Sequence, residues 1–244
     1  MFSKYNSENM KVEIWSDIMC PFCYIGKRRF EQALKEVKDN NFIEVEWKSF
    51  QLDSTIQSQP GKNVYEYLSE RKGISYEQSE QMHERVIQMA EQAGLAYNFD
   101  KAVIANSYDA HRLIQYAKKH KLGDEAEEHL FRAYFTEGRD FGSHDVLAAI
   151  GKEIGLDEQQ VKEMLTGEDF SSEVDADIYE AQQIGVRGVP FFVFDRKYAV
   201  SGAQASETFV EVLNRSFTEW RKENPLKELN VIEGDVCEPG KDCV

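Results

Sequence analysis

Two short segments near the start of the chain alternate hydrophobic with charged residues. The first covers residues 11–15 and the second residues 42–50, and in both the apolar side chains recur at every second position. This period of two is typical of a β-strand that buries one face, so we expect a strand in each segment. The apolar positions that define the two strands are Val12, Ile14, Ile43, Val45 and Trp47.

A helix is expected between these strands. Phe30, Ala33, Leu34 and Val37 lie three or four positions apart, which is the spacing of one helix face. Pro21 suits the first turn of this helix, because the N–H that proline lacks would have had no partner there. Strand, helix and strand make a βαβ unit, for which a right-handed crossover is expected.

Residues typical of loops follow from about Asp53, and a long helical stretch then runs to about Ile184. Serine or aspartate residues predict the starts of its helices, and two of them form the spacing of a capping box with a glutamine three positions on. Glycines predict the helix ends. The expected starts are Ser75 (with Gln78), Ser107, Ser143 and Asp157 (with Gln160), and the expected ends are Gly94, Gly123, Gly138, Gly155 and Gly185.

Strand patterns return at residues 189–194 and 198–200. A final amphipathic helix places its apolar residues on one face, at Phe209, Val212, Leu213, Phe217 and Trp220. The predicted order is therefore βαβ, a helical block and ββα, which indicates an α/β protein.

Composition and charge narrow the possible functions. The chain has 244 residues, of which 41% are hydrophobic, enough to bury a core without disulfides. Its formal charge of −15 repels phosphate backbones and anionic lipid, so we expect neither nucleic-acid nor membrane partners. No stretch approaches the roughly 20 apolar residues of a membrane helix. Residues 1–10 lack the apolar run of a secretory signal, so a cytoplasmic protein is expected.

The cysteines form two close pairs, Cys20/Cys23 and Cys237/Cys243. Paired cysteines in a cytosolic chain favour catalysis or metal binding over a structural disulfide. Cys20 stands at the start of the first predicted helix, directly before Pro21 and Phe22. The positive end of the helix dipole favours a thiolate there. We therefore expect Cys20 to attack disulfides and Cys23 to resolve the resulting mixed disulfide.

The chain resembles the DsbA-like branch of the thioredoxin superfamily, and more narrowly its FrnE-like family. The phrases at residues 17–27 and 185–193 carry this resemblance, and the phrase at 107–113 supports it. The resemblance implies a thioredoxin fold with a large all-helical insertion between its βαβ and ββα halves. It also implies that Pro190 is cis and that the Val189 backbone pairs with a peptide substrate beside Cys20.

On this basis the chain divides into four parts. We expect the N-terminal half of the thioredoxin fold at 11–60, the helical insertion at 61–185, the C-terminal half at 186–220 and a tail at 221–244. Cys237 and Cys243 flank a Pro-Gly turn in that tail. They form either an auxiliary redox pair, as some FrnE-like proteins carry, or one of three alternatives: a local structural disulfide, a metal loop or exposed thiols.

The leading hypothesis is a thiol–disulfide oxidoreductase acting on thiol- or disulfide-containing proteins or peptides. We expect no cofactor beyond the redox-active pair, with glutathione as a candidate reductant and partner, and no metal site. One alternative is a glutathione-dependent enzyme that resembles the 2-hydroxychromene-2-carboxylate isomerases and kappa-class glutathione transferases. Those relatives typically carry serine where this chain has Cys20, so the retained pair disfavours them. Another alternative is a binding module or a zinc protein using all four cysteines.

Histidine and aromatic residues supply weaker candidates. The histidines show no metal-ligand spacing such as His-Glu-x-x-His. His111 belongs to one of the family-like phrases, but packing or solvation is the more usual role of such a residue. Aromatic residues of the helical block could line a peptide groove, although we expect most to pack in the core. These residues are His83, His111, His120, His129 and His144, and Phe131, Tyr134, Phe135 and Phe141.

Overall fold

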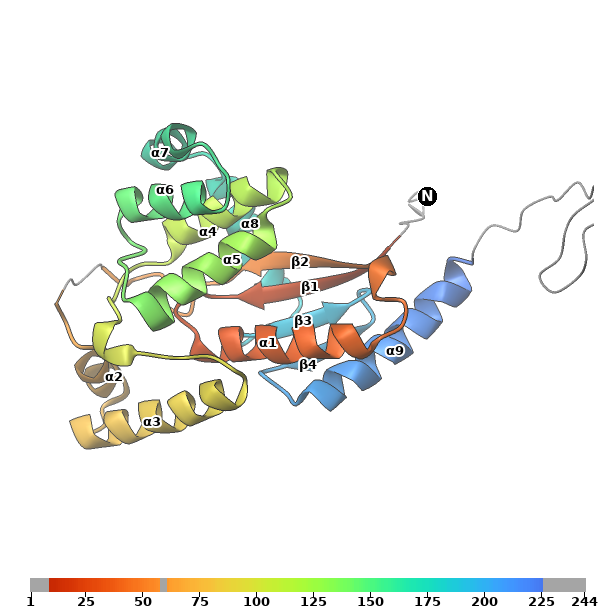
Figure 1. Cartoon of the computed structure of the whole chain (residues 1–244), viewed down its shortest axis with the longest axis horizontal. Helices are drawn as coiled ribbons and strands as arrows, with labels where there is room; N and C mark the ends of the chain where they lie inside the picture. The colour runs from red at the N-terminus through yellow and green to blue at the C-terminus, as the bar shows by residue number, and fades with distance from the viewer. Residues whose placement is uncertain (1–8, 58–60, 226–244) are drawn as a thin grey trace, which may run out of the picture.

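The computed structural model describes residues 9–57 and 61–225, and a four-stranded sheet lies at its centre (Figure 1). The strand order is β2-β1-β3-β4. β1 pairs with β2 in parallel, whereas the β1–β3 and β3–β4 pairs are antiparallel. The strands are β1 (Met10–Ser16), β2 (Ile43–Ser49), β3 (Phe191–Phe194) and β4 (Tyr198–Ser201).

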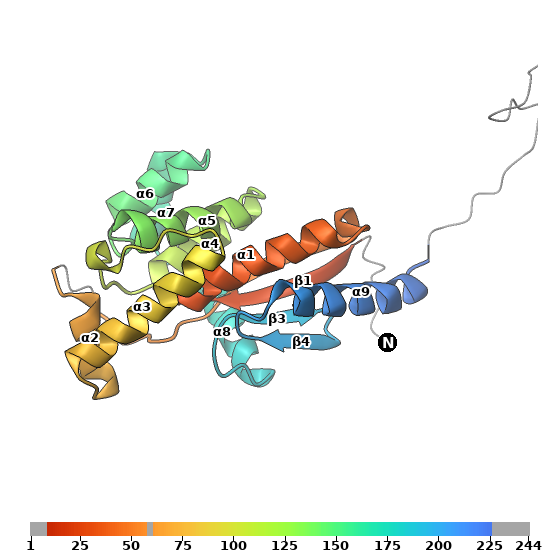
Figure 2. The same cartoon turned by 60° about the horizontal axis from the view of Figure 1, so that its bottom comes forward.

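Helices cover both faces of the sheet. α1 (Pro21–Glu36) and α9 (Ser206–Glu223) lie side by side on one face, and α8 (Ser171–Gln183) lies behind the other (Figure 2). Ile14 and Phe192 pair across the β1–β3 register, and both belong to the larger buried cluster with α1 and α9. Trp15, one residue on, packs in a second cluster with Ala181 of α8. β1 is therefore buried on both faces, whereas its alternating pattern predicted a strand that buries only one; Glu13 and Trp15 are covered from the α8 side.

The remaining helices form the block between β2 and β3. Figure 1 shows α4 to α7 stacked along one edge of the sheet, with α2 and α3 beyond the point where α1 begins. The helices are α2 (Val64–Lys72), α3 (Tyr76–Gln92), α4 (Tyr108–Lys119), α5 (Gly123–Arg132), α6 (His144–Glu153) and α7 (Glu158–Thr166). Short helical turns are η1 (Asn40–Phe42), η2 (Phe99–Lys101) and the π-helical η3 (Ala133–Glu137).

Most predicted helix ends are confirmed, with three differences. α2 was not separately predicted, although Asn63 caps its start by accepting from the Tyr65 N–H at 2.7 Å. Gly123 does not end a helix, because it is the first residue of α5, and Lys121 takes the left-handed conformation instead. The capping box at Ser75 is complete. At Asp157 only the aspartate half is present among the described residues.

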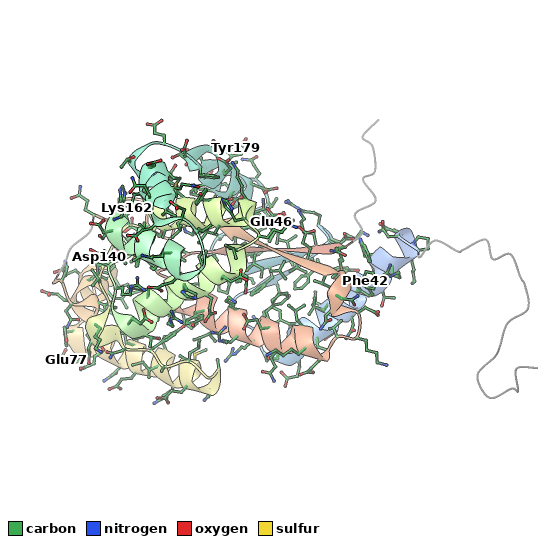
Figure 3. All side chains as sticks on the ribbon, turned by 45° about the horizontal axis from the view of Figure 1, so that its top comes forward. Phe42, Glu46, Glu77, Asp140, Lys162 and Tyr179 are labelled. Carbon is green, nitrogen blue, oxygen red and sulfur yellow. The ribbon has the colours of Figure 1, made fainter. Side chains whose placement is uncertain are left out.

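One buried cluster joins the sheet to the helical block. It runs from Met10 and Ile14 of β1 through Phe30 of α1 to Phe131 and Leu147 in α5 and α6. Partly buried side chains such as Phe42 pack against the outside of this cluster. In Figure 3 Phe42 lies beside α9, where its ring centroid is 6.5 Å from that of Phe217. None of the helices in the described ranges is long and apolar enough to cross a membrane.

Candidate active site

Cys20 lies where β1 has ended and α1 begins. It is the N-cap residue of α1, with extended backbone angles, and Pro21 occupies the first helical position as predicted. The Cys20 N–H donates to the Asp17 carbonyl at 2.9 Å, which fixes the turn between strand and helix. The side chain is only 4% exposed. Its sulfur therefore stands at a helix N-terminus, where the helix dipole favours negative charge.

Cys23 lies one turn into α1 and is buried, with 1% of its surface exposed. Burial raises the pKa of Cys23 well above its usual value, and the neighbouring Cys20 raises it further. The Asp17 backbone and the Ser16 side chain act in the opposite direction as hydrogen-bond partners. Both cysteines are free thiols in this structure. Cys23 therefore stays protonated until a base is available to it.

The loop before β3 lies against Cys20. The Val189–Pro190 peptide bond is cis, and the Cys20 thiol donates to the Val189 carbonyl at 3.4 Å. Gly26 of α1 permits this approach, since a Cβ there would lie 3.0 Å from Pro190 Cγ. The Gly202 N–H donates to the Pro190 carbonyl at 2.8 Å and holds the loop from the other side.

The basic residues that follow the cysteines in α1 all have other partners. The Lys27 amine lies 3.0 Å from the Asp124 carboxylate and also pairs with Glu31, while Arg28 pairs with Glu128. Arg29 donates to the Ala203 carbonyl at 2.6 Å. These charges link α1 to α5 and to the loop after β4.

A buried polar cluster lies behind Cys23. The Ser16 hydroxyl donates to the Glu127 carboxylate at 2.5 Å, and Glu127 is 1% exposed. Burial raises the pKa of Glu127 to about 7, despite the opposing effects of Ser16 and His111. Asp17, also buried, accepts from the Leu52 N–H at 2.7 Å. The cluster therefore places a carboxyl group whose pKa is raised to about 7 against the Ser16 hydroxyl beside Cys23.

His111 belongs to the same cluster. Its Nε2 lies 3.7 Å from Asp17 Oδ1 and has no hydrogen-bond partner among the described residues. Burial works to lower the pKa of His111, but the Asp17 and Glu127 carboxylates outweigh it and the pKa is raised. His111 is thus a buried residue next to the site, without the metal partners that a ligand would need. The described chain contains no group of three His, Cys, Asp or Glu residues arranged to hold a metal.

A cavity of about 390 Å³ opens beside Cys20. Pro21, Phe22 and Val189 of the predicted site line it together with residues of α2 and α3. Among the aromatic candidates only Tyr134 lines the cavity. Phe131, Phe135 and Phe141 are fully buried in the core, as expected. Cys237 and Cys243 lie outside the described residues.

Ser16 and Glu127 were not predicted as site residues. Ser16 is the last residue of β1, and it belongs to no sequence motif that would mark it as a site residue. Glu127 had a detectable signal, because it precedes Leu130 and Phe131 by three and four positions and so lies on the buried face of α5. A carboxylate on a buried face needs a partner. The sequence does not say that the partner is 111 positions away.

Comparisons with known proteins agree with this fold. A probable DsbA oxidoreductase of Streptomyces coelicolor, SCO1869, is 34% identical, with a TM-score of 0.81 over 95% of this chain and 97% of that one. An uncharacterised Bacillus subtilis protein, YwbO, is 29% identical over 83% of this chain and 95% of its own length. The cytosolic disulfide reductase DsbM of Pseudomonas aeruginosa, solved with GSH, shares the fold at 16% identity, with a TM-score of 0.58 over 88% of this chain and 100% of that one. The model of the DSBA-like thioredoxin domain matches residues 11–214, and the chain belongs to this family.

Proposed function

We propose that the protein is a thiol–disulfide oxidoreductase in which Cys20 attacks and Cys23 resolves. The observation that carries the proposal is the position of the Cys20 sulfur, at the N-terminus of α1 and 3.4 Å from the Val189 carbonyl. The Cys20 thiolate attacks one sulfur of a substrate disulfide and forms a mixed disulfide, and the other substrate sulfur leaves as a thiolate. Cys23 then attacks Cys20, which releases the second substrate thiolate. Two electrons pass from the cysteine pair to the substrate, and the reverse sequence oxidises a substrate dithiol.

The second step requires a proton to leave Cys23, whose pKa is raised by burial. Ser16 and Glu127 provide a route for it. The thiol proton passes to the Ser16 oxygen while the Ser16 hydroxyl proton passes to the Glu127 carboxylate. Glu127 suits this exchange because its pKa of about 7 lets it accept and return a proton near neutral pH.

The substrates we propose are thiol- or disulfide-containing proteins and peptides, which would pair with the Val189 backbone, and glutathione. Glutathione is supported by the DsbM structure with GSH, a protein of the same fold. We place this activity in the cytoplasm. Exchange of disulfides between the Cys20 pair and Cys237/Cys243 is a further part of the proposal. The test below replaces Cys237 and Cys243 by serine, so it measures the chemistry of Cys20 and Cys23 alone.

The test uses Cys20→Ser and Cys23→Ser, each made in a chain whose Cys237 and Cys243 are both serine. Cys23→Ser is expected to accumulate a mixed disulfide on Cys20 when incubated with a peptide disulfide, and Cys20→Ser to trap none. Peptide mass spectrometry of alkylated protein reads both outcomes. The same readout in glutathione and dithiothreitol buffers gives the potential of the pair. A value of about −270 mV is expected of a reductase and one of about −120 mV of a strong oxidant.

The glutathione-dependent isomerase or transferase is distinguished by the same variants. Catalysis on a glutathione conjugate that survives Cys23→Ser, in a protein whose Cys20 and Cys23 never form a disulfide, would replace the proposal above. Loss of thiol–disulfide exchange in both the Cys20→Ser and Cys23→Ser variants supports the oxidoreductase proposal.

A further inference from the structure

The cavity beside Cys20 has the properties of a small-molecule site. Its volume of about 390 Å³ lies within the range of drug-sized ligand pockets. Aliphatic side chains of α2 and α3, among them Val64, Leu68 and Val86, form much of its wall. Its mouth carries large apolar side chains that are unusually exposed, namely Phe22 at 38%, Met82 at 37% and Leu52 at 49%. Figures 1 and 2 both place α2 and α3 beside the end of the sheet where α1 begins.

A few polar groups interrupt this apolar lining. Tyr134 is 2% exposed and lines the cavity. Arg71 lines the cavity and pairs with the Asp53 carboxylate. Lys72, next to it, is exposed and makes no ion pair or hydrogen bond with any residue that the structure describes. The polar part of the lining therefore consists of the Tyr134 hydroxyl, His83, the Arg71–Asp53 ion pair and the unpaired Lys72 ammonium.

We propose that this cavity binds a low-molecular-weight disulfide that has an apolar body and carries a carboxylate. The inference rests on the proposed function and specifies its substrate class. The apolar body fills the cavity between α2, α3 and the Cys20 turn. The carboxylate lies toward Lys72 and Arg71, and the Tyr134 hydroxyl donates to a polar atom of the ligand. The disulfide reaches the Cys20 sulfur in the cavity wall.

Size and charge favour a small ligand of this kind. Cys20 is only 4% exposed and lines the cavity, so a ligand that fills the cavity lies directly against its side chain. The whole chain carries a formal charge of −15, which repels anions in general. Arg71 and Asp53, which both line the cavity, neutralise each other, so Lys72 leaves one net positive charge there to attract an anionic group.

The reaction balances without a further oxidant or reductant. The Cys20 thiolate attacks one sulfur of the bound disulfide, the distal thiolate leaves, and Cys23 releases the second thiolate as the Cys20–Cys23 disulfide forms. The substrate gains two electrons and becomes two thiols. A single turnover of the fully reduced protein therefore measures the step directly.

The experiment mixes the reduced full-length protein with three disulfides and follows oxidation of Cys20 and Cys23 by alkylation and mass spectrometry. The probes are dithiobis(nitrobenzoate), its neutral dimethyl ester, and hydroxyethyl disulfide, which is too small to need the cavity. The two aryl probes are expected to saturate with concentration, whereas the rate with hydroxyethyl disulfide stays linear. Lys72→Gln is expected to lower the second-order rate constant for the dicarboxylate by about fivefold and to leave the ester unchanged.

Two further variants complete the test. Val86→Phe reduces the cavity and is expected to slow both aryl probes by about tenfold without changing hydroxyethyl disulfide. Lys152→Gln, on the distant helix α6, removes the same charge and is expected to change nothing. The inference is overturned if the aryl probes follow hydroxyethyl disulfide in every variant, or if Lys152→Gln matches Lys72→Gln. Both outcomes leave the proposed function intact. That function fails instead if no probe oxidises the Cys20 pair.

Discussion

Glu127 is a carboxyl group held where water does not reach it, and its protonation affects the stability of the fold. Burial raises the pKa of Glu127 from 4.5 to about 7. Between these values the folded protein binds a proton that the unfolded chain has released, so this group makes stability fall as pH rises. His111 and Lys27 face the carboxylate and limit the rise, while Asp124 adds to it. The group that suits proton transfer therefore reduces stability above neutral pH.

Glu127→Gln is expected to remove this pH dependence. Glutamine keeps an acceptor for the Ser16 hydroxyl but does not ionise. From pH 5 to pH 8, the free energy of unfolding of the variant should rise relative to that of the wild type by on the order of 2–3 kcal/mol, from the cited pKa change. Urea unfolding at the two pH values measures the difference. A variant that is equally affected at both values would show that Glu127 is ionised throughout.

The helix pair α2–α3 forms one wall of the cavity, and its stability depends on how α3 begins. The Ser75 hydroxyl accepts from the Gln78 N–H at 3.1 Å, and the Gln78 side chain accepts from the Ser75 N–H at 2.9 Å. This box satisfies two donors that the first turn of a helix leaves free. The wall formed by Met82 and Val86 therefore depends on a local polar motif rather than on burial alone.

Ser75→Ala is expected to lower the free energy of unfolding by about 1 kcal/mol, because it leaves the Gln78 N–H without its acceptor. Amide hydrogen exchange in the first turn of α3 should accelerate. Ser172→Ala is the matched control, since that exposed hydroxyl near the start of α8 donates to the Glu173 side chain and caps no backbone amide. Equal losses in the two variants would show that the box contributes nothing specific.

The same elements show how far a sequence can be interpreted without a structure. The strands and α1 were predictable, because their apolar positions recur with the period of each element. α2 was not, although Asn63 and Gly73 bound it, because Val64 and Tyr65 are its only buried residues and form no stripe. The turn that carries Cys20 and Cys23 could be predicted from the residues directly around it. The cavity could not, since its wall joins α1 to helices more than forty positions away.

Charge and core packing act together across the whole molecule. The main buried cluster includes residues of β1, α1, α5 and α9, so the sheet and the helical block share one core. At their boundary Lys27 is 1% exposed and faces the carboxylates of Glu31, Asp124 and Glu128. Burial works to lower the pKa of Lys27, but these carboxylates outweigh it and the pKa is raised. The Lys27 ammonium group therefore pairs with a carboxylate of α1 and with two carboxylates of α5, and so links the thioredoxin-like part to the helical block.

Lys27→Met is expected to weaken both parts together. It leaves three carboxylates facing one another with only Arg28 nearby, and their partial exposure limits the loss in free energy of unfolding to about 1–2 kcal/mol. Because one core spans both parts, unfolding should remain a single transition. Trp15, Trp47 and Trp220 all lie in the sheet or α9 and report on that part by fluorescence, while far-UV circular dichroism is dominated by the helices. Both signals should shift to lower urea by the same amount. An earlier loss of the helical signal would mean that the block unfolds by itself.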